Sequence, residues 1–312
     1  ITVNASGLSD GTLSLSITAT DAAGNVSAAG TDTAEKDILA PAAPAITSIA
    51  GNDKINDSEK AAVIIIGTAE ANATISGSLT GTGDPVTVSG TADGDGNFSI
   101  TVNASGLSDG TLSLSITATD AAGNVSTAGT DTAVKDIAAP VISTVTSNAT
   151  GAGVLKVGDT ITFTVEIDTD EAGLTIAPTT YNGGKLSWST ADSGATYTAT
   201  YTVTEGDDDQ SSALQLTGVT ATDTFGNASA AVSGDDVTDT IDANSPDAPV
   251  ITSIAGDYKI NDSEKGAVDI IGTAEANATI GGTLTDTGEG SVTVSGSADG
   301  SGNVSITVNA SG

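Results

Sequence analysis

The chain repeats itself over stretches as long as a small domain. Residues 1–38 and 100–137 are identical except at Ala28/Thr127 and Glu35/Val134, and ITVNASG begins a third time at Ile306. Solenoid repeats are about 20–50 residues long, so this longer period indicates whole modules in series. The segments expected are part of a module at 1–38, a complete module at 39–137, a divergent module at 138–243 and part of a module at 244–312. Because both ends fall inside a repeat, we expect a window from a longer array.

Composition narrows the function classes. The 40 acidic residues face 8 lysines with no Arg or His, which gives a formal net charge of −32, and Cys and Met are absent. Nucleic acid and anionic membrane surfaces are poor partners for such a chain, because both need clustered cations. Disulfides, thiol catalysis and histidine-dependent chemistry are excluded. No apolar run has the length of a membrane span. We therefore expect no enzyme and no membrane insertion in this segment.

Alternating apolar and polar residues predict short strands with turn residues between them. LSLSITAT at 112–119 has the most regular alternation, and 62–67 is an apolar run typical of a buried strand. About seven short strands with frequent turns are typical of an antiparallel β-sandwich, so we predict an all-β chain of sandwich modules. In the complete module the strands are expected at 45–49, 62–67, 73–80, 86–90, 98–102, 112–119 and within 125–135. In the divergent module they are expected at 141–145, 160–167, 196–203 and 214–223.

Acidic residues recur where modules are expected to meet. In a seven-strand sandwich the second-to-third and sixth-to-seventh strand loops lie at the end where the chain enters, so Asp37, Glu70 and Asp120 should converge. The preceding module adds Asp10 from its exit end. At the next junction the candidates are Asp136, Asp168, Asp170, Glu171 and Asp223, with Asp109 and the stretch 52–60 (Asp53, Asp57, Glu59) from the module before. At the third junction they are Asp242 and Glu275.

Such acids need a partner charge. Crowded carboxylates repel and raise one another's pKa, and a hard divalent cation removes that conflict. Ca²⁺ accepts six to eight oxygen ligands in flexible geometry, which suits acids on turns, whereas Zn²⁺ prefers the absent His and Cys. We therefore expect Ca²⁺ at the junctions. For any single acid the alternative is ordinary turn capping, since Asp and Asn favour turns. For 52–60 both interpretations stay open, and the net charge also fits simple solubility.

Several motifs resemble a known family. GTAEANAT at 67–74, LSDGTLSLSITATDAAGNVS at 107–126 and KDIAAP at 135–140 resemble the bacterial Ig-like extender repeats of giant RTX-type, type I-secreted and biofilm-associated adhesins. The resemblance implies tandem Ig-like sandwiches, Ca²⁺ between domains, export in the unfolded state, and an extracellular stalk that holds a distal adhesion domain off the bacterial cell surface. As ligands it implies Asp37, Glu70, Asp120 and Asp136 most directly. Residues 138–243 depart from the GTAE turn, so the resemblance does not identify the ligand there.

Three alternatives stay open beside a calcium-stiffened stalk. The divergent module could bind a glycan or a surface through Trp188 and Tyr181, although both aromatics also suit a core. The chain could be a spacer in a secreted enzyme. It could also self-associate head to tail, because 244–312 lacks two last strands and 1–38 supplies such strands. Apart from that contact, the expected partners are neighbouring modules of the same chain.

Overall fold

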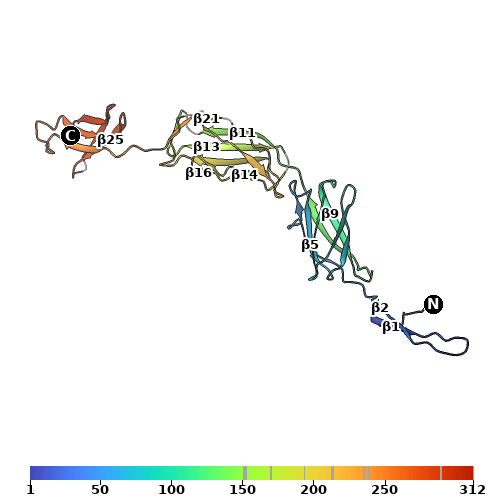
Figure 1. Ribbon diagram of the computed structural model, residues 1–312. Coiled ribbons are helices and arrows are strands. Elements are labelled where there is room, and N and C mark those ends of the chain that lie inside the picture. Colours follow the sequence, from blue (N-terminus) through green and yellow to red (C-terminus); the bar gives the residue numbers. More distant parts are fainter. Residues whose placement is uncertain are drawn as a thin grey trace.

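The computed structural model describes residues 1–149, 153–168, 171–192, 194–211, 214–234, 236–237, 239–288 and 290–311. Figure 1 shows β-modules that follow one another end to end, with the two termini at opposite ends of the row. Every regular element in this described part is a strand, which confirms the predicted all-β class. The same part of the chain contains no helix long and apolar enough to cross a bilayer.

The first complete module is a sandwich of two sheets. One sheet has the order β3-β5-β8, and the other has the order β4-β10-β9-β6-β7. All pairings are antiparallel except the short parallel contact between β4 and β10. The strands are β3 (Ala45–Ile49), β4 (Lys54–Ile55), β5 (Val63–Thr68), β6 (Thr74–Thr80), β7 (Val86–Thr91), β8 (Asn97–Val102), β9 (Gly110–Thr119) and β10 (Gly129–Lys135). This topology puts the β5–β6 and β9–β10 connections at the end where the chain enters the module.

Side-chain alternation explains the core of this module. Leu112, Leu114 and Ile116 of β9 are at most 1% exposed, while the serines between them face solvent. The apolar run 62–67 is buried on one face only, because Ile64 and Ile66 are 45% and 42% exposed. The expected strand is present as β5, but it is buried on one face alone, since antiparallel sheets commonly leave one face in water.

One glycine fixes the contact between β6 and β9. A Cβ atom on Gly77 would lie 2.1 Å from the carbonyl oxygen of Ser115 on the neighbouring strand. Any larger residue at this position would push the paired strands apart, so only glycine fits.

The second module is built of one four-stranded sheet and several two-stranded ladders. The larger sheet has the order β11-β13-β18-β17, and the ladders are β12-β22, β14-β20, β15-β16 and β19-β21. The strand expected at 214–223 is split into β19 and β20. The strands are β11 (Ile142–Ala149), β12 (Val154–Lys156), β13 (Thr160–Ile167), β14 (Thr175–Ala177), β15 (Thr180–Tyr181), β16 (Gly184–Lys185), β17 (Ser189–Thr190), β18 (Thr196–Thr202), β19 (Leu214–Gln215), β20 (Thr220–Thr222), β21 (Asp236–Val237) and β22 (Thr240–Asp242).

Aromatic side chains fill the core of the second module. The ring of Tyr181 packs edge-on against Phe163 and Tyr201, at centroid distances of 4.7 and 5.3 Å. Tyr181 is only 6% exposed, and burial raises its pKa above the usual range. Trp188 packs against the same core, and its indole N–H donates to the carbonyl of Pro178 at 2.8 Å. The two aromatics considered for sugar binding therefore do not form an exposed platform.

The outer segments each hold part of a sandwich. Residues 1–38 contain the hairpin β1 (Gly11–Ile17) and β2 (Gly30–Lys36). Leu15 and Ile17 of this hairpin are 52% and 54% exposed, although the matching Leu114 and Ile116 are buried. The third module has the sheets β23-β24-β27 and β25-β26. Its strands are β23 (Val250–Ile254), β24 (Val268–Thr273), β25 (Thr279–Thr285), β26 (Ser291–Ser297) and β27 (Asn303–Val308).

Candidate metal centre at the module junctions

The linker before each complete module bonds to the last turn of that module. The side-chain amide of Asn227 donates to the carbonyl of Asp136 at 3.0 Å, and Asn124 donates in the same way to Asp37 at 3.3 Å. The acids Asp223 and Asp120 belong to the same two turns. The structure therefore brings together the linker and the turn between the last two strands at both junctions.

These turns share the pattern Asp-x-x-Gly-Asn, and the aspartate holds them closed. In the second module, Asp223 Oδ1 accepts from the backbone N–H of Phe225 at 2.7 Å and of Asn227 at 2.9 Å. Its Oδ2 accepts from the Asn227 side chain at 2.8 Å. Gly226 adopts φ +94°, a left-handed conformation that favours glycine. The turn thus fixes Asn227 so that its side chain points at the linker.

Asp120 sits in the equivalent turn of the first module. Its pKa lies below the usual value, because the Asn124 side chain and the backbone N–H groups of Asn124 and Gly123 donate to its carboxylate. Turn capping, the alternative considered for single acids, is therefore part of what Asp120 does. Capping leaves lone pairs on the carboxylate, so it does not exclude a cation.

Glu171 at the second junction has a buried oxygen without a donor. Among the described residues, no group donates a hydrogen bond to its Oε2 atom. Burial raises the pKa of Glu171, and the charges of Asp223 and Asp136 raise it further. All three residues are partly buried. The charges of a linker acid and a turn acid therefore act on a carboxylate in a strand connection.

Asp10 and Asp109, which were predicted from the preceding modules, face lysines. Lys36 lies 3.0 Å from Asp10, and Lys135 lies 3.4 Å from Asp109. Lys135 is only 2% exposed, and its ammonium group also donates to the carbonyl of Leu107. Asp109 Oδ2 accepts from the backbone of Ile137 at 3.3 Å. These two acids therefore position the start of each linker, and their role as metal ligands stays a prediction.

The other predicted ligands are less enclosed. Asp170 lies outside the described residues. Within the described part of the chain, no three acidic side chains come close enough to form a ready-made metal site. A cation at a junction would therefore need backbone carbonyls or water in addition to carboxylates. Besides Asp10 and Asp109, the predicted ligands that are solvent-exposed are Asp37, Glu70, Asp168, Asp242 and Glu275, and their ligand roles stay predictions.

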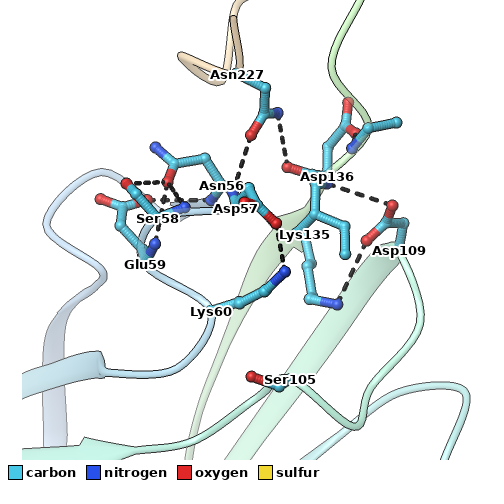
Figure 2. Close-up of polar contacts among 12 residues, drawn as sticks. Asn56, Asp57, Ser58, Glu59, Lys60, Ser105, Asp109, Lys135, Asp136 and Asn227 are labelled. Atoms are coloured by element: carbon cyan, nitrogen blue, oxygen red, sulfur yellow. Dashed lines mark hydrogen bonds and ion pairs between the residues drawn. The ribbon is translucent and has the colours of Figure 1, made fainter.

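The loop at 52–60 makes contacts that the sequence did not predict. Asp53 Oδ1 accepts from the backbone of Ile49 at 2.9 Å, and Asp57 pairs with Lys60. Figure 2 shows Asn56 and Asp57 beside Asn227 of the next module, with Lys135, Asp136 and Asp109 on the other side. The backbone N–H of Asp57 donates to Asn227 Oδ1 at 2.9 Å.

The sequence offered one signal for this loop. KINDSEK at 54–60 recurs unchanged at 259–265. An ion site and a turn were the two interpretations considered for it, and a docking surface was not.

Family comparisons place two domains on the chain. Residues 40–136 match the family model of the bacterial Ig domain, and residues 136–241 match that of the bacterial Ig-like domain. No curated protein matches the sequence.

Several solved structures are similar to this chain. A bacterial 1.5-MDa ice-binding adhesin has 24% identity over 86% of this chain and 86% of its own, with a TM-score of 0.33. An immunoglobulin-like domain of the M. primoryensis ice-binding adhesin has 31% identity over 31% of this chain and 100% of its own, with a TM-score of 0.26. The fibronectin(III)-like modules of Clostridium thermocellum CbhA have 13% identity over 64% and 94%, with a TM-score of 0.36.

Proposed function

We propose that this chain, which carries two tandem bacterial Ig-like domains, is a stalk segment of a bacterial surface adhesin whose module junctions are stiffened by Ca²⁺. It would act as a non-catalytic spacer outside the cell and hold a distal adhesion domain away from the surface. Export through a type I pathway and a part in biofilm formation belong to the same proposal, through the resemblance to RTX-type extender repeats.

One observation carries the calcium proposal. Glu171 Oε2 is a buried oxygen that receives no hydrogen bond within the described part of the chain, and Asp223 and Asp136 add negative charge to its surroundings. An ionised carboxylate with a buried, unpaired oxygen destabilises the folded state, so this arrangement favours a bound cation.

The donor chemistry fits Ca²⁺ better than other metals. The three side chains offer only carboxylate oxygens, and the chain has no His or Cys for zinc. Glu171, Asp223 and Asp136 would hold the ion, with further oxygens from the turns or from water. The cation would supply the positive charge that cancels their repulsion.

The mechanical consequence follows from where the three acids lie. Asp136 is in the linker, whereas Glu171 and Asp223 belong to the second module. Mutual repulsion among them would weaken the contact between the linker and the module, and cancelling that repulsion would strengthen it. A calcium-poor cytoplasm would leave the chain looser for export, and a calcium-rich exterior would stiffen and stabilise it by mass action.

Calcium titration of the whole chain tests the proposal, with Glu171→Gln and a matched control, the exposed Glu166→Gln, in the same module. We expect Ca²⁺ to stabilise the second module by about 2.7 kcal/mol at a hundredfold excess over Kd, which raises its unfolding temperature. Glu171→Gln should abolish this gain at that module, whereas Glu166→Gln should keep it. Equal calcium responses in wild type and Glu171→Gln would reject the site.

Small-angle scattering tests the mechanical part. We expect the maximum dimension of the chain to shrink modestly on addition of EDTA, because protein contacts still join the modules around Asp136, and to recover with Ca²⁺. An unchanged dimension would reject the stiffening role, even if calcium binds.

Head-to-tail self-association is a second candidate activity. The exposed Leu15 and Ile17 of hairpin β1–β2 match residues that are buried in the first complete module. In that module β6 pairs with β9 along its length, and β25 is the equivalent of β6. The hairpin of one copy could therefore pair with β25 of another. Sedimentation at increasing concentration should show assemblies that Leu15→Asp prevents, and a concentration-independent monomer would reject this candidate.

A further inference from the structure

The contact between the first two complete modules depends on a loop and a turn that fit each other. The loop is 54–60, before β5, and the turn is 223–227, after β20. Asn56 Nδ2 donates to the carbonyl of Phe225 at 3.0 Å, and the Lys54 ammonium donates to the carbonyl of Thr224 at 3.0 Å. The same ammonium lies 4.8 Å from the centre of the Phe225 ring, within the range of a cation–π contact.

Asn227 is the residue that ties three segments together. Its Oδ1 accepts from the backbone N–H of Asp57 at 2.9 Å. Its amide group donates to Asp136 of the linker at 3.0 Å and to Asp223 of its own turn at 2.8 Å. The residue as a whole is 5% exposed. With these hydrogen bonds formed, the buried amide fixes the positions of the loop, the linker and the turn relative to one another. Removing the amide would leave its buried partners unpaired.

The loop is shaped by its own hydrogen bonds. Asn56 Oδ1 accepts from the backbone N–H of Glu59 at 3.1 Å, and the backbone N–H of Asn56 donates to Glu59 Oε2 at 3.1 Å. These reciprocal bonds have the pattern of a capping box, and they leave Asn56 Nδ2 free to donate to the neighbouring module. Ile55 anchors the loop, because its side chain is fully buried and β4 pairs with β10.

The repeat of the loop in the third module supports this view. The backbone of Asn261 donates to Glu264 Oε2 at 3.1 Å, and Asn261 Oδ1 accepts from the backbone of Ser263 at 3.0 Å. The same conformation therefore forms where, among the described residues, no turn of another module contacts it. The loop thus needs no neighbour to take its shape.

We infer that the Lys-Ile-Asn-Asp-Ser-Glu-Lys loop is a docking element for the Asp-x-x-Gly-Asn turn of the module that follows it, and that it keeps the two modules aligned without a metal ion. The favoured partner is a turn with an aromatic residue in its third position, as in Phe225, because Lys54 contacts that ring. The inference builds on the proposed stalk role but not on calcium, since every contact named here joins protein atoms only.

The test uses the whole chain with spin labels at Thr87→Cys and Ser189→Cys, one in each module. Both positions are exposed, and the native chain has no cysteine. Pulsed dipolar spectroscopy then measures the distribution of distances between the labels. In EDTA we expect a narrow distribution for this labelled chain and one at least twice as wide after Asn227→Ala.

Asn124→Ala is the matched control, because it removes the same amide from the same kind of turn at the other junction. It should leave the distribution unchanged. Lys54→Ala should give a smaller widening, and it decides the outcome if Asn227→Ala unfolds the second module. An unchanged width in both variants would overturn the inference. Widening of the unsubstituted labelled chain in EDTA to the extent of Asn227→Ala would also overturn it, while leaving the calcium proposal intact.

Discussion

The junction around Asp136 and the junction around Asp242 begin alike and differ in what surrounds them. Each aspartate accepts a hydrogen bond from the residue two positions on, Ala138 at 3.0 Å and Asn244 at 3.2 Å. Around Asp136, bonds reach the linker from the modules on both sides. Around Asp242, the linker residues Asn244 and Ser245 bond to Asp209 and Glu205 of their own module.

The residues around Asp136 and Asp242 differ in burial and charge, although the two aspartates hold equivalent positions in their linkers. The second module places Glu171, a partly buried acid, beside Asp136, whereas Glu275 of the third module is exposed. The residue before Asp136 is the buried Lys135, and the residue before Asp242 is Ile241. The partly buried acids around Asp136 therefore make it the stronger candidate for a cation site, and the ligand roles of Asp242 and Glu275 stay predictions.

The largest effect is expected from the buried lysine that distinguishes the two junctions. Lys135→Ala leaves the carbonyl of Leu107 without its donor and removes a packed side chain, so the first complete module should lose about 2–4 kcal/mol of stability. Denaturant unfolding followed for that module measures the loss. The exposed Lys156→Ala should change stability by less than about 0.5 kcal/mol. A similar small effect for Lys135→Ala would show that its burial contributes little.

Glycine substitutions in the two linkers should affect the two junctions differently, because hydrogen bonds from the modules on both sides hold the linker around Asp136. The double substitution Pro246→Gly and Pro249→Gly removes two fixed φ angles, so the third module should reorient more widely. Ala138→Gly with Ala139→Gly should have little effect, because Asn227 and the 54–60 loop hold the first junction. Label-to-label distance distributions across each junction measure both. Equal broadening at the two junctions would contradict the comparison.

Much of the fold could be predicted because the sequence has two periodic patterns, the long repeat of whole modules and the alternation of apolar and polar residues. The repeat defines the modules, and alternation defines strands such as 45–49, 98–102 and 112–119 almost to the residue. The divergent module was harder, because its short ladders, such as β15 and β16, have too few residues to show a period. The exposed face of 62–67 was missed because an apolar run does not reveal which sheet face is in water.

The candidate site was predicted less completely. Which strand connections meet at a junction follows from topology, so Asp136 and Asp223 could be placed together. Nothing in the stretch Asp168–Glu171 shows which acid turns inward. Nothing in the local sequence singled out Asn227, whose side chain accepts a hydrogen bond from Asp57, 170 positions away in the chain. Contacts that distant are set by how modules dock, which local patterns do not report.

A pH titration sharpens the contrast at Glu171. Because its pKa is raised in the folded state, the folded protein holds this proton at higher pH than the unfolded chain does. Without calcium, the stability of the second module should therefore fall as pH rises from the ordinary glutamate range through the folded-state pKa. Calorimetry in EDTA should show this trend, and Glu171→Gln should remove it. Added Ca²⁺ should reverse it, with protons released on binding.

The smallest effect is expected at the other linker. Ser245 donates its backbone N–H to Glu205 at 2.9 Å, and the serine lowers the pKa of that exposed carboxylate. The bond is therefore present above the usual glutamate pKa and is lost as pH falls through the lowered folded-state value. Glu205→Gln should speed amide exchange at Ser245 a few-fold and leave the unfolding temperature unchanged, because an exposed contact contributes little to global stability. A clear drop in unfolding temperature would mean that this linker, like the one around Asp136, is part of the folded unit, and the contrast between the junctions would be lost.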